Sequence, residues 1–304
     1  MCGIFGFIGK RAAAPLLVEG LRRLEYRGYD SSGIVVKNGS LQVHKKVGKV
    51  SELSKVLPNH IAGNSGIAHT RWATHGGVTD ANAHPHLSEN ESIAVVHNGI
   101  INNSRDLRNR LEQRGFELKS ETDSEALVHM ISIGIESGQE PLEAVRQTLK
   151  RATGTWGLCV LFKDHDLIVC ARNGSPLILG KGDGESFIAS DPHALSQHTQ
   201  NFYFLEDGDM AVVTRDGIDI SRLEGGMSST SMTVIEDEWG EADMAGFPTF
   251  MLKEIHEQPE ALRRCITGRL DMANGSAKLG GLRLEPLRLR TTPHVRLIGC
   301  GTAL

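Results

Sequence analysis

The chain begins with MCGIFGFIG, residues 1–9, in which a cysteine directly follows the initiator methionine and precedes a glycine. The apolar run over residues 2–9, punctuated by glycines, is typical of a buried strand. Packing does not require a thiol at the first position of such a strand, where cysteine would serve only as a small hydrophobic side chain. We therefore ask whether Cys2 is a structural residue or a nucleophile.

A cysteine at the N-terminus of a mature chain has a base within its own residue. A free thiol, with a pKa near ~8.5, is mostly protonated at neutral pH. An α-amino group has a pKa of about 7.7–8.0, so part of it is unprotonated at cytoplasmic pH. If Met1 is removed, the amine of Cys2 can accept the thiol proton, directly or through a water. We therefore expect removal of Met1 to make Cys2 the nucleophile.

The bulk composition is that of an ordinary soluble protein. The 304 residues allow one large domain, or one domain and part of another, and the net charge of −4 gives no electrostatic case for nucleic acid or a membrane surface. The chain has no apolar run of about 18 residues and no signal-peptide order at its start. Its cysteines are odd in number and form no C-x-x-C pair, at Cys2, Cys159, Cys170, Cys265 and Cys300. We expect a reduced, cytoplasmic protein without a metal or another cofactor.

Strands and helices are predicted in blocks rather than in strict alternation. Helical patterns are centred on Leu17–Leu24, Val50–Leu57, Leu107–Leu111, the segment after Asp123, and Leu142–Leu149. A hairpin with an Asn38-Gly39 turn is predicted over residues 32–47, strands over 66–71 and 92–99, and a series of short strands from Trp156 to Ile220. This order favours an α+β fold with stacked sheets over a doubly wound parallel sheet.

The character of the chain changes after about Leu223. Residues 250–270 are charged and helical, with an interruption expected at Pro259, and residues 294–304 are an apolar strand that enters a glycine turn. A strand that opens a fold and then stops resembles the first element of a second domain. An unpaired strand at 295–298 would also be an aggregation site unless a partner covers it.

Several long motifs appear in order along the chain: MCGIFGFIG, GLRRLEYRGYDSSGI (20–34), GIAHTRWATHG (66–76), NAHPH (82–86), VVHNGII (95–101), SETDSEA (120–126), RNGSPLILG (172–180), FIASD (187–191), LEDGD (205–209) and KEIHEQPEALRRCITGRL (253–270). Together they resemble the glutaminase half of the glutamine–fructose-6-phosphate aminotransferase family, a class II amidotransferase of the N-terminal-nucleophile hydrolase fold. The resemblance implies a four-layer αββα sandwich, with two stacked sheets between helix layers. It also implies a glutaminase domain over 2–240, an interdomain linker with a helix over 241–293, and the first strand of a truncated sugar-isomerase domain over 294–304.

The implied reaction is hydrolysis of L-glutamine to glutamate and ammonia through a thioester on Cys2. In the full-length enzyme the ammonia would serve the synthesis of glucosamine 6-phosphate. Fructose 6-phosphate would bind only through the missing isomerase domain, so this chain alone is expected to make no amino sugar. The full-length enzyme is expected to be a homodimer, with neither nucleic acid nor membrane as a partner.

The resemblance assigns the oxyanion hole to Asn98 and Gly99, although an Asn-Gly pair by itself is chiefly a turn signal. The Asn98 side chain and the Gly99 backbone would donate N–H groups, one such donor typically being worth about 3 to 4 kcal/mol of barrier. Asp123 would bind the substrate α-ammonium. Because an Asp before a helix is also an ordinary N-cap, we expect Ser124 to cap the helix and leave Asp123 available.

Arg71 is assigned to the substrate α-carboxylate, which a planar guanidinium binds through two hydrogen bonds. Thr74 and His75 are expected to contact the same carboxylate. Trp72 is expected to be the lid residue of a loop over residues 72–80 that closes over glutamine, although plain packing would also explain this side chain. His84 is placed near the substrate amide. Arg27 and Asp30 are expected to support the strand of Cys2 without taking part in the chemistry.

Three other functions remain as alternatives. Five histidines, at 69, 75, 84, 86 and 97, suggest a zinc hydrolase, although the sequence has no H-E-x-x-H helix. The chain would alternatively be a regulatory remnant that binds glutamine without transferring ammonia. A third possibility is a glutaminase half that serves a different acceptor, as in the synthesis of asparagine or phosphoribosylamine.

Overall fold

The structure, a computed structural model, describes residues 2–73, 76–235 and 246–267, and beyond them only residues 270–271, 276–277, 291, 293–294 and 296. The chain divides into two units, Met1–Trp239 and Gly240–Leu304, and each is described by itself. Among the described residues, no helix has both the length and the apolar character needed to pass through a lipid bilayer.

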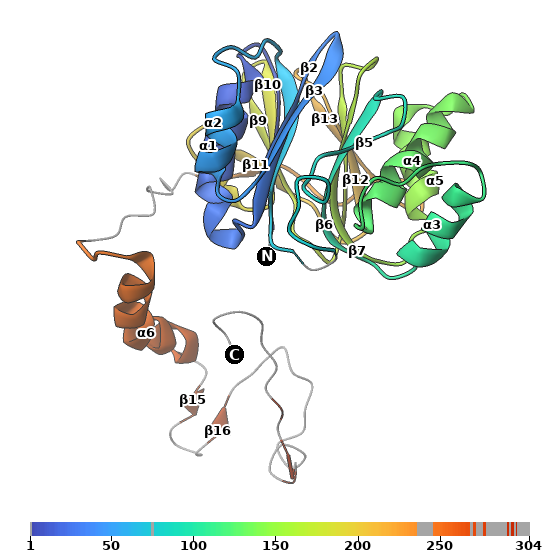
Figure 1. Cartoon of the computed structure of the whole chain (residues 1–304). Coiled ribbons are helices and arrows are strands. Elements are labelled where there is room, and N and C mark those ends of the chain that lie inside the picture. Colours follow the sequence, from blue (N-terminus) through green and yellow to red (C-terminus); the bar gives the residue numbers. More distant parts are fainter. Residues whose placement is uncertain are drawn as a thin grey trace. The chain divides into compact units, whose positions relative to one another are not determined.

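Two antiparallel sheets form the middle of the first unit (Figure 1). The eight-stranded sheet has the order β14-β11-β9-β10-β1-β4-β2-β3, and the six-stranded sheet has the order β13-β12-β8-β7-β6-β5. The strands are β1 Gly3–Ile8, β2 Ser31–Asn38, β3 Ser40–Val47, β4 Ser65–Arg71, β5 His86–Leu87, β6 Ile93–Ile101, β7 Gly154–Phe162, β8 Ile168–Asn173, β9 Ile178–Gly182, β10 Glu185–Ala189, β11 Asn201–Phe204, β12 Asp209–Val213, β13 Ile218–Arg222 and β14 Thr233–Val234.

Helices cover the outer face of each sheet (Figure 1). The eight-stranded sheet carries α1 Ala13–Leu24 and α2 Val50–Val56, and the six-stranded sheet carries α3 Ser104–Glu112, α4 Ser124–Glu136 and α5 Pro141–Leu149. Two short 3₁₀ helices, η1 Glu25–Arg27 and η2 Pro192–Ala194, complete the unit. The layers therefore follow the order helix, sheet, sheet, helix, and the predicted αββα sandwich is confirmed.

The first strand is buried on both faces because it lies in the interior of this sandwich. Phe5 and Phe7 pack with the α1 side of the core, whereas Ile4 and Ile8 pack between the two sheets. Full burial of each such side chain contributes about 2 kcal/mol. Because β1 pairs with β4 on one side and β10 on the other, the position of Cys2 at its start is set by both neighbours.

The second unit contains α6 Phe250–Ile266 and the short strands β15 Leu270–Asp271 and β16 Ser276–Ala277. The predicted interruption at Pro259 is wrong, because α6 continues through this residue. Proline removes one backbone N–H from the helical ladder, and here the turns on both sides continue in spite of that loss. The strand predicted within 294–304 falls mostly outside the described residues.

Candidate active site

Cys2 lies directly before β1, where the two sheets approach each other. Its Sγ accepts a hydrogen bond from the backbone N–H of Trp72 at 3.1 Å, and its carbonyl oxygen accepts one from Asn98 Nδ2 at 3.1 Å. Trp72 follows β4 in the larger sheet, whereas Asn98 belongs to β6 in the smaller one. The cysteine is therefore held by groups from both sheets.

The glycine that follows this cysteine is required by close packing. A Cβ on Gly3 would lie 2.6 Å from Thr70 Oγ1 and 2.7 Å from Leu24 Cβ, so a larger residue would displace β1. The same hydroxyl of Thr70 accepts the N–H of Gly3 at 3.1 Å. Thr70 thus both excludes a side chain at position 3 and, through this hydrogen bond, fixes the position of the strand next to Cys2.

The surroundings of the thiol favour its protonated form. Burial raises the pKa of the Cys2 thiol, and the N–H of Trp72 and the charge of Arg71 only oppose this effect. Within the described residues, the hydrogen bonds of Sγ are made with the backbone of Trp72 and with no carboxylate or imidazole. A nucleophilic role for Cys2 therefore requires a base other than these neighbouring side chains.

The amide of Asn98 is fixed by a hydrogen bond at each end. Its Nδ2 donates to the carbonyl of Cys2, and its Oδ1 lies 2.9 Å from Nε2 of His69. Because an amide oxygen only accepts, Nε2 of His69 carries the hydrogen in this pair. Burial lowers the pKa of His69 to about 3, so the ring is neutral at physiological pH. His69 thus determines which end of the Asn98 amide faces the cysteine, a role that sequence reasoning missed.

Gly99 follows Asn98 in a backbone conformation that disfavours any side chain. Its φ is 138°, and a Cβ there would lie 2.1 Å from the carbonyl oxygen of Thr155 on β7. His97, two residues before Gly99, is buried, and its Nε2 donates to the same Thr155 carbonyl at 3.2 Å. The backbone that would present the Gly99 N–H is therefore held against the neighbouring strand.

Arg71 ends β4 and points its buried guanidinium into the same region. Nη1 donates to the carbonyl of Gly77 at 3.0 Å, within the loop that follows. Trp72 is 47% exposed, and its ring meets Tyr29 edge-on at a centroid distance of 6.0 Å. Trp72 is therefore half-exposed and packs on one side against Tyr29. Thr74 and His75, predicted to contact the substrate, lie outside the described residues.

Asp123 directly precedes α4, and its carboxylate reaches back to β6. Oδ2 accepts the backbone N–H of Ile101 at 2.7 Å. The prediction that Ser124 caps this helix is wrong, because Ser124 is its first helical residue and neither side chain caps the N-terminus. The hydroxyl of Ser124 instead lies 2.8 Å from Nδ1 of His97, so it hydrogen-bonds to this imidazole and not to a backbone N–H of the helix.

A small cavity of about 30 Å³ brings these predicted residues together. It is lined by Cys2, His69, Arg71, Trp72, His84, His97, Gly99, Thr122, Asp123 and Ser124. This volume holds roughly two or three water molecules, so part of the lining must move before a ligand the size of an amino acid enters. His84, predicted near the substrate amide, is buried here with its ring stacked on His69 at 4.3 Å.

Arg27 and Asp30 occupy different positions around this site. Arg27 Nη1 donates to the carbonyl of Ser190 at 3.3 Å, and the hydroxyl of Ser190 accepts the N–H of Ile4 on β1 at 3.0 Å. Asp30 instead accepts the N–H of Ala73 at 2.9 Å. Arg27 thus reaches the strand of Cys2 through one residue, whereas the carboxylate of Asp30 supports the start of the 72–80 loop.

The histidines around the site serve as hydrogen-bonding and stacking groups. His84 Nδ1 accepts the N–H of His97 at 3.2 Å, and His86 Nε2 lies 3.0 Å from Thr122 Oγ1. In the part of the chain that the structure describes, His, Cys, Asp and Glu side chains form no group of three or more with the geometry of a metal site.

Sequence comparison relates the chain to glutamine amidotransferases. Residues 69–197 match the family described as a glutamine amidotransferase domain. The chain is 45% identical over 318 residues to the isomerizing glutamine–fructose-6-phosphate aminotransferase of Chlorobaculum tepidum, and 46% identical over 307 residues to that of Thermus thermophilus. Each alignment covers 100% of this chain and 50% of the relative, so the chain spans about half the length of these curated relatives.

Structural comparison gives the same relationship. The glutamine phosphoribosylpyrophosphate amidotransferase from Bacillus subtilis, complexed with ADP and GMP, matches with a TM-score of 0.64 and 26% identity, over 73% of this chain and 49% of that one. A glutamine aminotransferase class-II domain protein from Silicibacter pomeroyi matches with a TM-score of 0.51 and 16% identity, over 73% of this chain and 98% of that one. At this lower identity, the second likeness bears on the fold alone.

Proposed function

This chain carries the glutamine amidotransferase domain of the glutamine–fructose-6-phosphate aminotransferase family, and from that premise we propose that it hydrolyses L-glutamine to glutamate and ammonia at Cys2. The observation that carries the proposal is the single cavity lined by Cys2, Arg71, Gly99 and Asp123, with the Asn98 amide bound to the cysteine. Together these residues supply a nucleophile, N–H donors, a cation and an anion, which are the groups needed to bind and hydrolyse a zwitterionic amide substrate.

The base in this mechanism is the α-amine of Cys2 after Met1 has been removed. The amine takes the thiol proton, and the sulfur attacks the side-chain amide carbon of glutamine. Asn98 Nδ2 and the Gly99 N–H stabilise the resulting oxyanion. The protonated amine then gives its proton to the leaving nitrogen, so that ammonia departs and a thioester remains. Water, deprotonated by the same amine, hydrolyses the thioester to glutamate.

Substrate recognition is divided between the two charged ends of glutamine. Arg71 binds the α-carboxylate, together with Thr74 and His75, and Asp123 binds the α-ammonium. Trp72 closes over the bound substrate as the lid residue of the 72–80 loop, and His84 lies beside the amide. The small cavity is consistent with a loop that opens to admit glutamine and closes again over it, because its lining must move before glutamine fits.

We assign the ammonia to the synthesis of glucosamine 6-phosphate from fructose 6-phosphate. Identities of 45% and 46% over the whole chain to two fructose-6-phosphate aminotransferases support this acceptor over phosphoribosylpyrophosphate, whose amidotransferase is 26% identical over 73% of the chain. In this proposal residues 2–240 are the glutaminase domain, 241–293 a linker and 294–304 the first strand of the isomerase domain that binds the sugar phosphate. The complete enzyme would be a cytoplasmic homodimer.

The proposal is tested by incubating the purified chain with glutamine, adding fructose 6-phosphate, and quantifying glutamate, ammonia and amino sugar. We expect equal amounts of glutamate and ammonia, and a loss of at least about 10³-fold in Cys2→Ala. Cys265→Ala, which removes an exposed thiol on α6, is the matched control. Mass spectrometry of the active protein should show that Met1 is absent.

Three results would contradict the proposal. Turnover by Cys2→Ala that a chelator abolishes would identify a zinc hydrolase. Binding of glutamine without ammonia release would identify a regulatory protein. Full activity in protein that retains Met1 would exclude the α-amine as the base.

A further inference from the structure

Gly77 has both of its backbone polar groups bound by side chains. Its N–H donates to Glu121 Oε2 at 3.0 Å, and its carbonyl accepts from Asn82 Nδ2 at 3.0 Å as well as from Arg71 Nη1 at 3.0 Å. The guanidinium assigned to the substrate α-carboxylate is therefore joined to the loop that follows it. Any movement of the Gly77 carbonyl changes the surroundings of Arg71.

Asn82 and Glu121 also bind each other, so that the contact with Gly77 is part of a closed ring. Asn82 Nδ2 donates to Glu121 Oε2 at 2.9 Å, and the N–H of Glu121 donates to Asn82 Oδ1 at 2.9 Å. The N–H of Gly77, followed by the amide of Asn82, lowers the pKa of Glu121. The carboxylate is thus ionised at neutral pH, and hydrogen bonds to an ionised acceptor are shorter and stronger than neutral ones.

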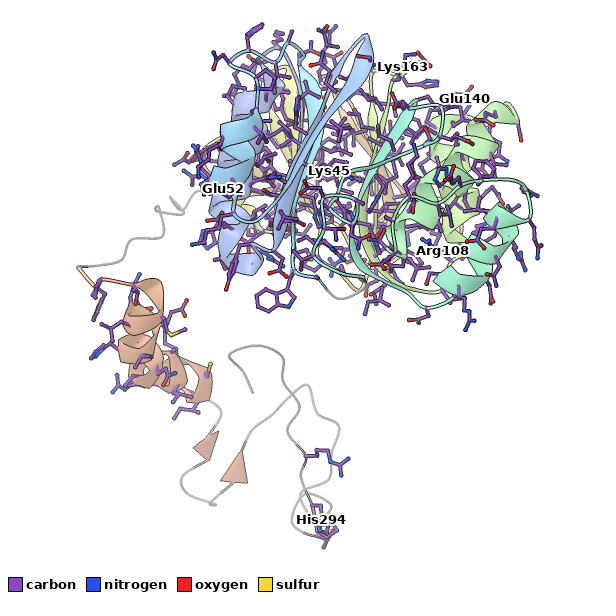
Figure 2. The ribbon with its side chains drawn as sticks, in the orientation of Figure 1. Lys45, Glu52, Arg108, Glu140, Lys163 and His294 are labelled. Carbon is purple, nitrogen blue, oxygen red and sulfur yellow. The ribbon has the colours of Figure 1, made fainter. Side chains whose placement is uncertain are left out.

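Arg108 of α3 holds the backbone on both sides of Glu121. Nη1 donates to the carbonyl of Thr122 at 2.9 Å, and Nη2 donates to that of Ser120 at 2.7 Å. Figure 2 labels Arg108 among the helices that cover the six-stranded sheet. The carboxylate of Glu121 is therefore fixed to the side of the molecule that carries Asp123, whereas Gly77 belongs to the loop that leaves the other sheet.

We propose that Glu121 and Asn82 are positioning residues, which hold the carbonyl of Gly77 against Arg71 and thereby orient the guanidinium for the substrate α-carboxylate. This inference rests on the proposed function, in which Arg71 binds that carboxylate. Glu121 touches neither the nucleophile nor the oxyanion donors, so its contribution belongs to substrate binding. Its loss weakens the recognition of glutamine and leaves the reactivity of Cys2 unchanged.

The test uses the full chain with Glu121→Ala, Glu121→Gln and the matched control Glu117→Ala, which removes an exposed carboxylate from the same segment. In Glu121→Ala we expect KM for glutamine to rise about tenfold, with kcat within about twofold of the original chain. Glu121→Gln keeps an oxygen that accepts both hydrogen bonds, so we expect a rise of only about threefold. Glu117→Ala should change neither constant.

A second measurement separates binding from nucleophilicity. Alkylation of Cys2 by iodoacetamide should proceed at the original rate in Glu121→Ala, while the L-glutamate concentration that gives half-protection rises about tenfold. An unchanged KM, or a fall in kcat or in the alkylation rate as large as the rise in KM, would overturn the inference.

Amide hydrogen exchange at Gly77 provides a readout that needs no turnover. The exchange should be at least about tenfold faster in Glu121→Ala than in the original chain or in Glu117→Ala, because its carboxylate acceptor is lost. Equal exchange rates would overturn the inference even if the original chain proved inactive. If the original chain were inactive but exchange were faster in Glu121→Ala, the proposed function would be contradicted, whereas the contact by which Glu121 holds Gly77 would be supported.

Discussion

The cavity at Cys2 joins two regions that are held in different ways. Asn98 and Gly99 lie within β6, where the backbone pairs with β7 over the whole strand. The loop that begins at Arg71 is held instead at separate points, by the side chains around Gly77 and by Asp80, which accepts the N–H of Val47 at 2.7 Å. Groups on a strand are positioned more precisely than groups on a loop, and a loop held by a few polar contacts opens more readily than a fully paired strand.

This difference divides the proposed reaction between the two regions. The strand region holds the groups that act on the oxyanion, and the loop region holds the groups that recognise the amino acid. Substitutions in the strand region are therefore expected to lower kcat, and those in the loop region to raise KM. The following predictions test the strand region, and the Glu121 variants described above test the loop region.

The largest effect is expected from Asn98→Ala. Removal of one oxyanion donor typically lowers kcat by about 10²–10³-fold, and KM for glutamine should stay within about threefold. Steady-state glutaminase kinetics measure both constants. Asn109→Ala, on the exposed face of α3, is the control. A rise in KM that accounts for the whole loss would remove the distinction between the two regions.

A smaller effect is expected from His69→Ala, which leaves the buried Oδ1 of Asn98 without its donor. We expect kcat to fall about tenfold to 100-fold, and His69→Gln to recover most of that loss because its amide also donates. Nitrogen-15 NMR should show a neutral ring with hydrogen on Nε2 from pH 5 to 9, since the pKa of His69 is about 3. A ring that titrates near pH 6.5 would contradict this role.

The smallest effect at neutral pH concerns the stability of the segment that leads to Asp123. Burial would raise the pKa of Glu125, but the nearby ring of His129, whose Nε2 lies 3.8 Å from Oε1, and hydrogen bonds from the N–H groups of Lys119 and Ser120 outweigh it and lower the pKa to about 2. Because this value lies below the ordinary ~4.3, the ionised group stabilises the fold above about pH 4.5, and this contribution is lost as pH falls toward 2.

Urea unfolding of the original chain and of Glu125→Gln measures this contribution. The original chain should have the higher midpoint at pH 7, and the two midpoints should converge as pH approaches 2. At pH 7, kcat of the variant should stay within about threefold, since Glu125 acts on stability rather than on the reaction. A difference between midpoints that is constant from pH 7 to pH 2 would contradict the assignment.

Much of the fold was predictable because its elements have strong periodic patterns. Leu17, Leu21 and Leu24 lie on the buried face of α1, and the Asn38-Gly39 turn joins β2 and β3 as expected. The short strands β5 and β14 were missed, since two residues are too few to establish a period. The continuation of α6 through Pro259 was missed because local propensity alone favours a break there.

The site was predictable only as far as sequence motifs extend. The resemblance assigned Cys2, Arg71 and Asp123, and the structure places them around one cavity. The bond between His69 and Asn98 was missed, because it joins strands of different sheets and depends on how those sheets stack. His69 was counted only among possible zinc ligands. The closed set of hydrogen bonds through Glu121 was missed for a similar reason, since Asn82 lies 39 positions away along the chain.

The central place of β1 also sets the order of events on the ribosome. One of its edges pairs with β10, and the N–H of Ile4 reaches Ser190, which is synthesised 186 positions later. That edge therefore stays unpaired while most of the unit is still being translated. In the proposed function, removal of Met1 would thus come before the strand is enclosed, and the proposed site would be complete only once both sheets have been synthesised.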